Sequence, residues 1–121
     1  RRVDALTANG ALWAVTAEDG RLWRLDSGGS ILAIQPTNTL NGPHLAGLPG
    51  GAFFVSDPAR SLVLYFSANG QPRAQLETLG SLITPTGVAA VQSGDVVYLA
   101  VVDSATCTLS WWQGPASALP Q

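Results

Sequence analysis

The sequence contains no methionine and no lysine, and it has a single cysteine. Because Cys107 stands alone, no disulfide can form within the chain and no cysteine-based metal cluster can be built. Its neighbours Thr106 and Thr108 lie in an apolar stretch, which predicts a small buried side chain rather than a reactive thiolate. The absence of methionine indicates a processed product or a piece of something longer.

Charge is also scarce. Eight carboxylates oppose six basic residues, all of them arginine, and the net charge is -2 with an isoelectric point near 5.0. No broad positive field is available to attract a phosphate backbone, so we expect no nucleic-acid partner. The low charge and the many threonine, serine and glycine residues favour an extracytoplasmic or secreted location.

Long apolar runs are missing too. No run approaches the roughly 18 residues that span a bilayer, and no signal-type apolar segment follows Arg1-Arg2-Val3. We therefore expect no membrane span. Apolar residues nevertheless make up 46% of the chain, which is enough to build a core.

The apolar residues come in short runs without helical spacing, which predicts an all-β fold. The expected strands are Ala11–Thr16, Arg21–Leu25, Ile31–Gln35, Ala52–Ser56, Leu62–Phe66, Ala74–Leu76, Gly87–Val91, Val96–Val102 and Cys107–Trp112. Dipeptides that allow positive φ in tight turns separate them: Asn9-Gly10, Asp19-Gly20, Gly28-Gly29, Gly50-Gly51, Asn69-Gly70 and Ser93-Gly94.

The turns recur at a long period. Gly10, Gly51 and Gly94 each lead an apolar strand, and their spacings are 41 and 43 residues. The segments 21–29 and 62–70 also match, again 41 residues apart. A repeat of about 40 residues with some four short strands has the size of one blade of a β-propeller. We therefore predict about three blades, at residues 1–42, 43–84 and 85–113, followed by a tail or linker at 114–121.

A family resemblance rests on three segments of the middle repeat. The segments Gly42-Pro43-His44-Leu45-Ala46, Gly51–Asp57 and Leu62–Gly70 resemble an NHL repeat, and Pro85–Ala89 with Gly94–Leu99 resembles its first half. The resemblance implies an NHL-like propeller. Departures are Leu62 in place of the family's arginine, which Arg21 matches, and the run 112–115 in place of the closing Asp-x-x-Gly turn. The first repeat has no Pro-Gly at its inner strand, which predicts that it begins midway.

Three blades do not close a ring, since propellers have four to eight, and an open stack exposes blade faces and strand edges. We therefore expect partners, either the remaining blades of a parent protein or a second copy of the chain that completes a six-bladed ring. A β-sandwich of about nine strands is the structural alternative, and it needs no partner.

Candidate site residues are few. His44 falls at the start of an inner strand, near the mouth of a propeller channel, where it can contact a ligand. As the sole histidine, it cannot assemble the His-rich zinc sites of propeller lyases related to this family. Asp57, Asp95 and Asp103 recur near strand ends and are assigned to turns, where aspartate bonds its own backbone. We predict no catalytic, metal-binding or cofactor-binding residue in this chain.

Trp111 and Trp112 are adjacent in an expected strand, so their side chains face opposite sides and only one can enter a given core. The exposed indole is a candidate for ligand recognition or for an interface. The other interpretation is that both indoles pack between blades or against missing parts of a parent protein.

The leading functional hypothesis is a non-catalytic binding or scaffold module that recognises protein or carbohydrate. One alternative is part of a propeller enzyme, of lyase or hydrolase type, whose site residues lie mostly in blades outside this chain. Another is a structural subunit of an extracellular assembly that uses open edges for strand addition.

Overall fold

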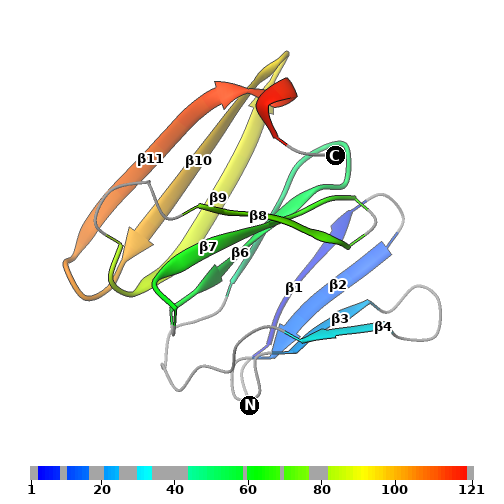
Figure 1. Ribbon diagram of the computed structural model, residues 1–121, viewed down its shortest axis with the longest axis horizontal. Coiled ribbons are helices and arrows are strands. Elements are labelled where there is room, and N and C mark those ends of the chain that lie inside the picture. The colour runs from blue at the N-terminus through cyan, green and yellow to red at the C-terminus, as the bar shows by residue number, and fades with distance from the viewer. Residues whose placement is uncertain are drawn as a thin grey trace.

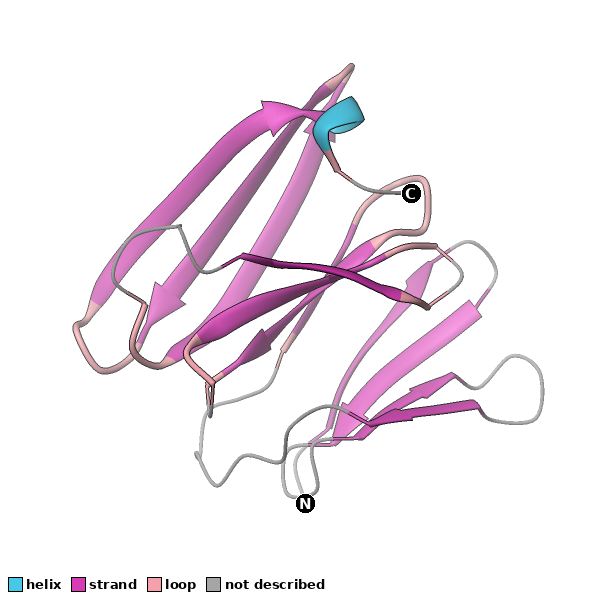
Figure 2. Ribbon diagram, viewed as in Figure 1, coloured by secondary structure: helices cyan, strands magenta, loops and turns pink. Residues whose placement is uncertain are grey.

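The computed structural model describes residues 3–8, 11–16, 21–24, 30–33, 44–58, 60–68, 70–76 and 82–119, with backbone pairing alone for the strands before residue 44. The elements of the described part are β-strands apart from one short 3-10 helix (Figure 2). The predicted turns Asn9-Gly10, Asp19-Gly20 and Gly28-Gly29 lie outside the described residues, as do Leu25, Ile34 and Gln35 of the expected strands.

Three antiparallel sheets follow one another along the chain, and within each sheet the strands pair in sequence order. The first, blade 1, contains β1 (Val3–Ala8), β2 (Ala11–Thr16), β3 (Arg21–Arg24) and β4 (Ser30–Ala33). Blade 2 contains β5 (Leu45–Gly47), β6 (Phe53–Asp57), β7 (Leu62–Phe66) and β8 (Pro72–Leu76). Blade 3 contains β9 (Pro85–Ser93), β10 (Val96–Asp103) and β11 (Thr108–Pro115), and the 3-10 helix η1 (Ala116–Ala118) follows it.

The blades are stacked side by side in chain order (Figure 1). The first strands of successive blades are in contact, with β1 next to β5 and β5 next to β9. Meandering sheets that succeed one another and meet at their first strands are the arrangement of a β-propeller, whereas a sandwich has two sheets face to face. The predicted all-β propeller fold is thus confirmed.

The 41-residue repeat between blades 1 and 2 is present in the strand pairing itself. Thr16 pairs with Arg21 at the end of the β2–β3 hairpin, and Asp57 pairs with Leu62 at the end of the β6–β7 hairpin. Each member of the second pair lies 41 positions after its counterpart in the first. The repeat read from the sequence therefore marks equivalent hairpins.

Blades 2 and 3 are related by a different spacing. In both, an aspartate ends the second strand and a non-glycine residue with positive φ precedes the third: Asp57 with Ser61 at φ 59°, and Asp103 with Cys107 at φ 54°. Both residues of the second pair lie 46 positions after the first. The 43-residue spacing of Gly51 and Gly94 instead compares two unlike turns. Gly94 and Asp95 form a two-residue turn at the tip of a longer hairpin, while five residues separate Gly47 from its partner Phe53.

Blade 2 is enclosed by its neighbours. Every residue of β6 and β7 is buried, on both faces of the sheet. On one face Phe53 and Phe66 stack with ring centroids 5.1 Å apart. The opposite face contributes to a core shared with blade 3, made of Leu48, Phe54, Val63, Tyr65, Val97, Leu99, Val101 and Leu119. Burial on both faces is expected of a blade with a neighbour on each side.

The structure corrects three expectations from the sequence. β1 pairs with β2 along its full length, so the first repeat has its inner strand and does not begin midway. Cys107 is exposed rather than buried, because it occupies the positive-φ turn between β10 and β11. Gly114 and Pro115, assigned to a tail, are the last residues of β11, and Leu119 is buried in the shared core. Pro120 and Gln121 lie outside the described residues.

Candidate functional site

The side of blade 3 that faces away from blade 2 exposes large apolar side chains. Along β10, Val97, Leu99 and Val101 are fully buried, whereas Tyr98 and Val102 between them are exposed. This alternation follows from the pleat, which directs successive side chains to opposite faces. The large apolar side chains that are exposed on the three strands, here called the open face, are Val91, Tyr98, Val102, Leu109 and Trp111.

The open face is continuous because its residues lie opposite one another in the strand ladder. Tyr98 pairs with Val91 on one side, and Val102 pairs with Leu109 on the other. Trp111 lies between these rows, opposite Ala100. Directly paired side chains approach within about 5.5 Å, so the exposed groups form one patch rather than scattered positions. Contiguous apolar patches of this kind mark interaction sites more often than single exposed residues do.

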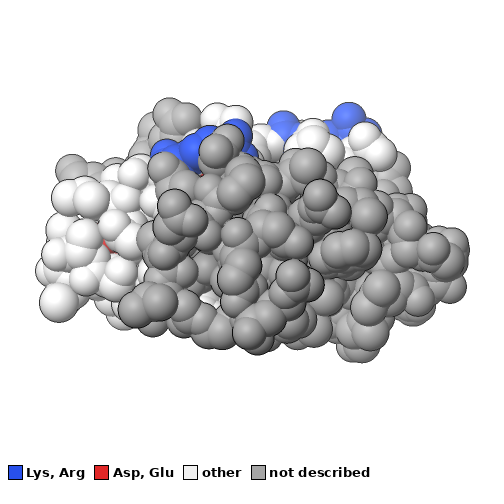
Figure 3. Space-filling model, turned by 90° about the horizontal axis from the view of Figure 1, so that it is seen from below, with Lys and Arg blue, Asp and Glu red and all other residues white. Residues whose placement is uncertain are grey.

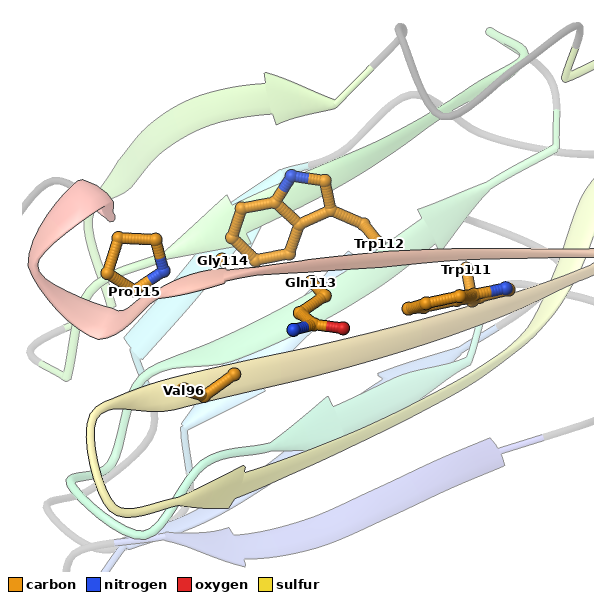
Figure 4. Close-up of a pocket in the computed structure, with 6 residues that line it drawn as sticks. All are labelled: Val96, Trp111, Trp112, Gln113, Gly114 and Pro115. Atoms are coloured by element: carbon orange, nitrogen blue, oxygen red, sulfur yellow. The ribbon is translucent and has the colours of Figure 1, made fainter.

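A shallow, open pocket of about 550 Å³ runs along β11 at this patch. Its lining residues are Val96, Trp111, Trp112, Gln113, Gly114 and Pro115 (Figure 4). Figure 4 shows the two indoles on opposite sides of the β11 ribbon, as the strand pleat requires. Trp111 is 64% exposed, whereas Trp112 is half-buried and packs against the core shared by blades 2 and 3.

The open face has a buried counterpart within the same chain. With the 46-residue spacing that relates Asp57 to Asp103, Tyr65 corresponds to Trp111 and Val63 corresponds to Leu109. Tyr65 and Val63 are buried in the core between blades 2 and 3. There the ring of Tyr65 packs against Phe54 with centroids 5.3 Å apart, and burial raises the pKa of its hydroxyl. The open face of blade 3 thus corresponds to the face of blade 2 that blade 3 covers.

Asp103 fixes one end of this blade. Its Oδ2 atom accepts hydrogen bonds from the backbone N–H groups of Ile83 at 2.7 Å and Thr84 at 3.1 Å. Its Oδ1 atom accepts from those of Ala105 at 3.0 Å and Thr106 at 3.3 Å. Burial by itself raises the pKa of Asp103, but the four backbone donors outweigh it and hold the pKa below its ordinary value. The carboxylate therefore ties the β10–β11 turn to the segment that enters β9.

Asp57 has the equivalent position in blade 2. Its carboxylate is buried and accepts a hydrogen bond from the backbone N–H of Arg60, and it pairs with the Arg60 side chain at 2.7 Å. Both aspartates thus serve their turns, as the sequence predicted. Asp95, the third candidate, is exposed in the β9–β10 turn.

His44, the predicted ligand contact, lies immediately before β5 and is half-buried. Its backbone N–H donates to Ser56 Oγ at 2.9 Å, and its carbonyl accepts from the N–H of Ser56 at 3.0 Å. Ser56 Oγ in turn donates to the carbonyl of Thr86 at 2.7 Å. This chain of bonds links the inner strands of blades 2 and 3. His44 and Trp111 therefore belong to different parts of the molecule, one at an inner strand and one on the open face.

On the face in Figure 3, basic atoms gather along one edge, and the other described atoms are almost all uncharged. Within the described part of the chain, no three His, Cys, Asp or Glu side chains come together as a metal site would require. In that same part of the chain, no helix is long and apolar enough to cross a membrane.

The sequence signals identified only part of this site. Trp111 and Trp112 stood out as an unusual pair, and their opposite orientations follow from strand geometry alone. Val91, Tyr98, Val102 and Leu109 were missed. The signal that could have revealed them is the pairing register, which depends on the Asp103 turn.

No protein-family model matches the sequence, and no curated protein sequence matches it. A solved structure that resembles the fold is the crystal structure of selenomethionine-substituted virginiamycin B lyase from Staphylococcus aureus, a β-propeller. The match has a TM-score of 0.58 at 12% identity and covers 90% of this chain. The chain spans 40% of the length of that protein. At this identity the likeness concerns the fold alone, and it identifies the three stacked sheets as blades of a β-propeller.

Proposed function

We propose that the chain is a binding and scaffold module built from NHL-like propeller blades, and that its open face binds a further blade. The observation that carries the proposal is the register equivalence between Trp111 and Tyr65. Tyr65 is 3% exposed because blade 3 covers it, whereas Trp111 is 64% exposed. Blade 3 packs on the corresponding face of blade 2, so the open face of blade 3 is suited to pack against another blade in the same way.

The composition of the open face supports a protein partner over a carbohydrate. The aliphatic side chains of Val91, Val102 and Leu109 share this face with Trp111 and Tyr98, and the polar side chain beside the two rings is that of Gln113, which pairs with Tyr98. Sugar hydroxyls need several polar partners beside a stacking ring, whereas a protein interface core is apolar and rich in Trp and Tyr. When the chain is studied alone, a second copy of the chain supplies the blade that covers the open face.

Self-association of the Trp111→Ser variant, measured by sedimentation equilibrium, tests the proposal. We expect its dimer dissociation constant to rise by about 30-fold, because a central tryptophan in an interface commonly contributes 2 kcal/mol or more. Ile83→Ser is the matched control, since Ile83 is 52% exposed but lies in the loop before β9. Equal association of wild type and Trp111→Ser would contradict the proposal.

A second candidate is a part of a propeller enzyme, which the similarity in fold to a virginiamycin B lyase and the position of His44 beside an inner strand favour. In this case the remaining site residues lie in blades beyond this chain. His44→Ala would then lower the catalytic activity of the complete protein. Activity measurements on the complete protein distinguish the two candidates, since the scaffold proposal predicts no effect of His44→Ala.

A further inference from the structure

Blade 3 has three strands among the described residues, whereas blades 1 and 2 have four. The equivalence of Asp57 and Asp103 identifies which strand has no counterpart. β7 follows the Asp57 turn as the third strand of blade 2, and β11 follows the Asp103 turn as the third strand of blade 3. The strand without a counterpart is therefore the fourth, β8.

The chain does not continue from β11 as it does from β7. After β7 it reverses in a tight turn, in which the N–H of Gly70 donates to the carbonyl of Ser67 and the N–H of Ser67 donates to that of Gln71. The residue that corresponds to Ser67 in blade 3 is Gln113, and there β11 runs on to Pro115. The 3-10 helix then leads to Leu119, which is buried in the core shared with blade 2. The residues just after β11 thus pack toward blade 2 and do not pair with β11 as a fourth strand.

The pairing pattern shows which backbone groups of β11 face away from β10. The N–H of Ala116 donates to the carbonyl of Asp95, which places the hydrogen-bonded pairs of this ladder at Ala116 and every second residue before it. In an antiparallel ladder the residues between such pairs direct their N–H and C=O groups to the other side. For β11 these are Leu109, Trp111 and Gln113. Pro115 is next in this series and has no N–H, so it ends the row.

We propose that this edge of β11 binds an extended peptide segment of a partner protein as the antiparallel fourth strand of blade 3. The β7–β8 ladder is the template. Leu76 lies opposite Val63 and Ala74 lies opposite Tyr65, while the alternate residues, Arg73 and Gln75, are exposed.

The segment that fits therefore places a large aliphatic side chain opposite Leu109 and a small one opposite Trp111, with polar residues at the alternate positions. Backbone hydrogen bonds supply affinity in this mode, and the alternate side chains supply selectivity. The proposal extends the proposed binding function from the open face to the adjacent edge, and it rests on that function for the identity of the partner as protein.

Amide hydrogen exchange of the full chain, followed by NMR, tests this edge directly. The probe is a capped synthetic peptide with the sequence of residues 71–78, added at millimolar concentration. We expect exchange at Leu109, Trp111 and Gln113 to slow about tenfold or more, because these amides gain partners. Exchange at Ser110 and Trp112 is expected to stay unchanged, because their amides already bond β10.

Two N-methylated peptides serve as matched controls. Methyl groups on the amides of the Ala74 and Leu76 positions block the hydrogen bonds to β11, so this peptide is expected to give no protection. Methyl groups on the Arg73 and Gln75 positions face away from β11 and are expected to leave protection intact. Absence of protection by the unmodified peptide, or equal protection by both methylated forms, would overturn the strand-addition proposal. Dimerisation of Trp111→Ser tests the open face and peptide protection tests the edge of β11, so failure of either proposal does not contradict the other.

Discussion

Asp103 is a charged group whose role in the fold depends on pH. Its carboxylate is 1% exposed and accepts four backbone N–H groups, which hold its pKa below the ordinary value. Because the folded-state pKa is lowered, the carboxylate stabilises the fold at neutral pH. This contribution is lost as the pH falls below about 4, where the unfolded chain takes up the proton first.

Asp103→Asn is therefore expected to lower the free energy of unfolding at pH 7 by about 2 kcal/mol, since an amide cannot accept from all four donors. The difference from wild type is expected to shrink as the pH is lowered through this range. Urea unfolding at several pH values measures it, with Asp95→Asn as the control because Asp95 is exposed in the β9–β10 turn. A difference that is independent of pH would contradict the role of the charge.

Gly114 and Trp112 depend on each other on the buried side of β11. A Cβ atom at Gly114 would lie 2.5 Å from the Cζ2 atom of Trp112, so the indole must move. We expect Gly114→Ala to destabilise the fold by about 1–3 kcal/mol through this overpacking. Gly50→Ala is the control, because a Cβ there meets no atom within 4 Å. Thermal unfolding of the two variants checks the difference, and equal stability would contradict the packing of Trp112.

At the scale of strands, the sequence predicted the strand bounds correctly where turn residues flanked an apolar run on both sides. β7 and β2 match the expected ranges at both ends. β1 was missed and β5 was recognised only through the family resemblance, because β5 has three residues and β1 has no regular alternation. The burial of Cys107 was predicted wrongly, because a sequence of threonines and cysteine reads as strand while the backbone there turns with positive φ.

The open face required information that periodicity does not contain. The alternation of Trp111 and Trp112 follows from the pleat, but which indole faces blade 2 depends on the register of β10 and β11. That register is set by the Asp103 turn, whose equivalence to the Asp57 turn was hidden by the different hairpin lengths of blades 2 and 3. The 43-residue spacing of Gly51 and Gly94 matched two turns, whereas the strands of blades 2 and 3 are related by 46 residues.

Substitutions on a covered blade face and on an exposed one are expected to differ in their effect on stability. Phe54 lies in the core between blades 2 and 3, so Phe54→Ala is expected to lower the free energy of unfolding by about 3–5 kcal/mol. Tyr98→Ala, on the open face at 37% exposure, is expected to have an effect below about 1 kcal/mol at monomer concentrations. Chemical unfolding at low protein concentration compares the two. A large effect of Tyr98→Ala under these conditions would show that the open face is already covered within one chain.

For the whole molecule, three blades pose the problem of ring closure. The middle blade is buried on both faces, and blade 3 is buried on one. The sequence anticipated this, because a repeat of about 40 residues fits three times into the chain and propellers have four to eight blades. It could not show which surface remains open, since that depends on side-chain orientation in β9, β10 and β11.

The mass of the chain in solution, measured by light scattering over a range of concentrations, tests the central claim most directly. If the open face receives another blade, the chain forms a dimer near twice its mass of 12.5 kDa as the concentration rises. In this case Trp111→Ser reaches the dimer mass only at about 30-fold higher concentration than the wild type. A folded wild-type chain that keeps the monomer mass at every concentration would contradict the claim that its third blade is built to bind another.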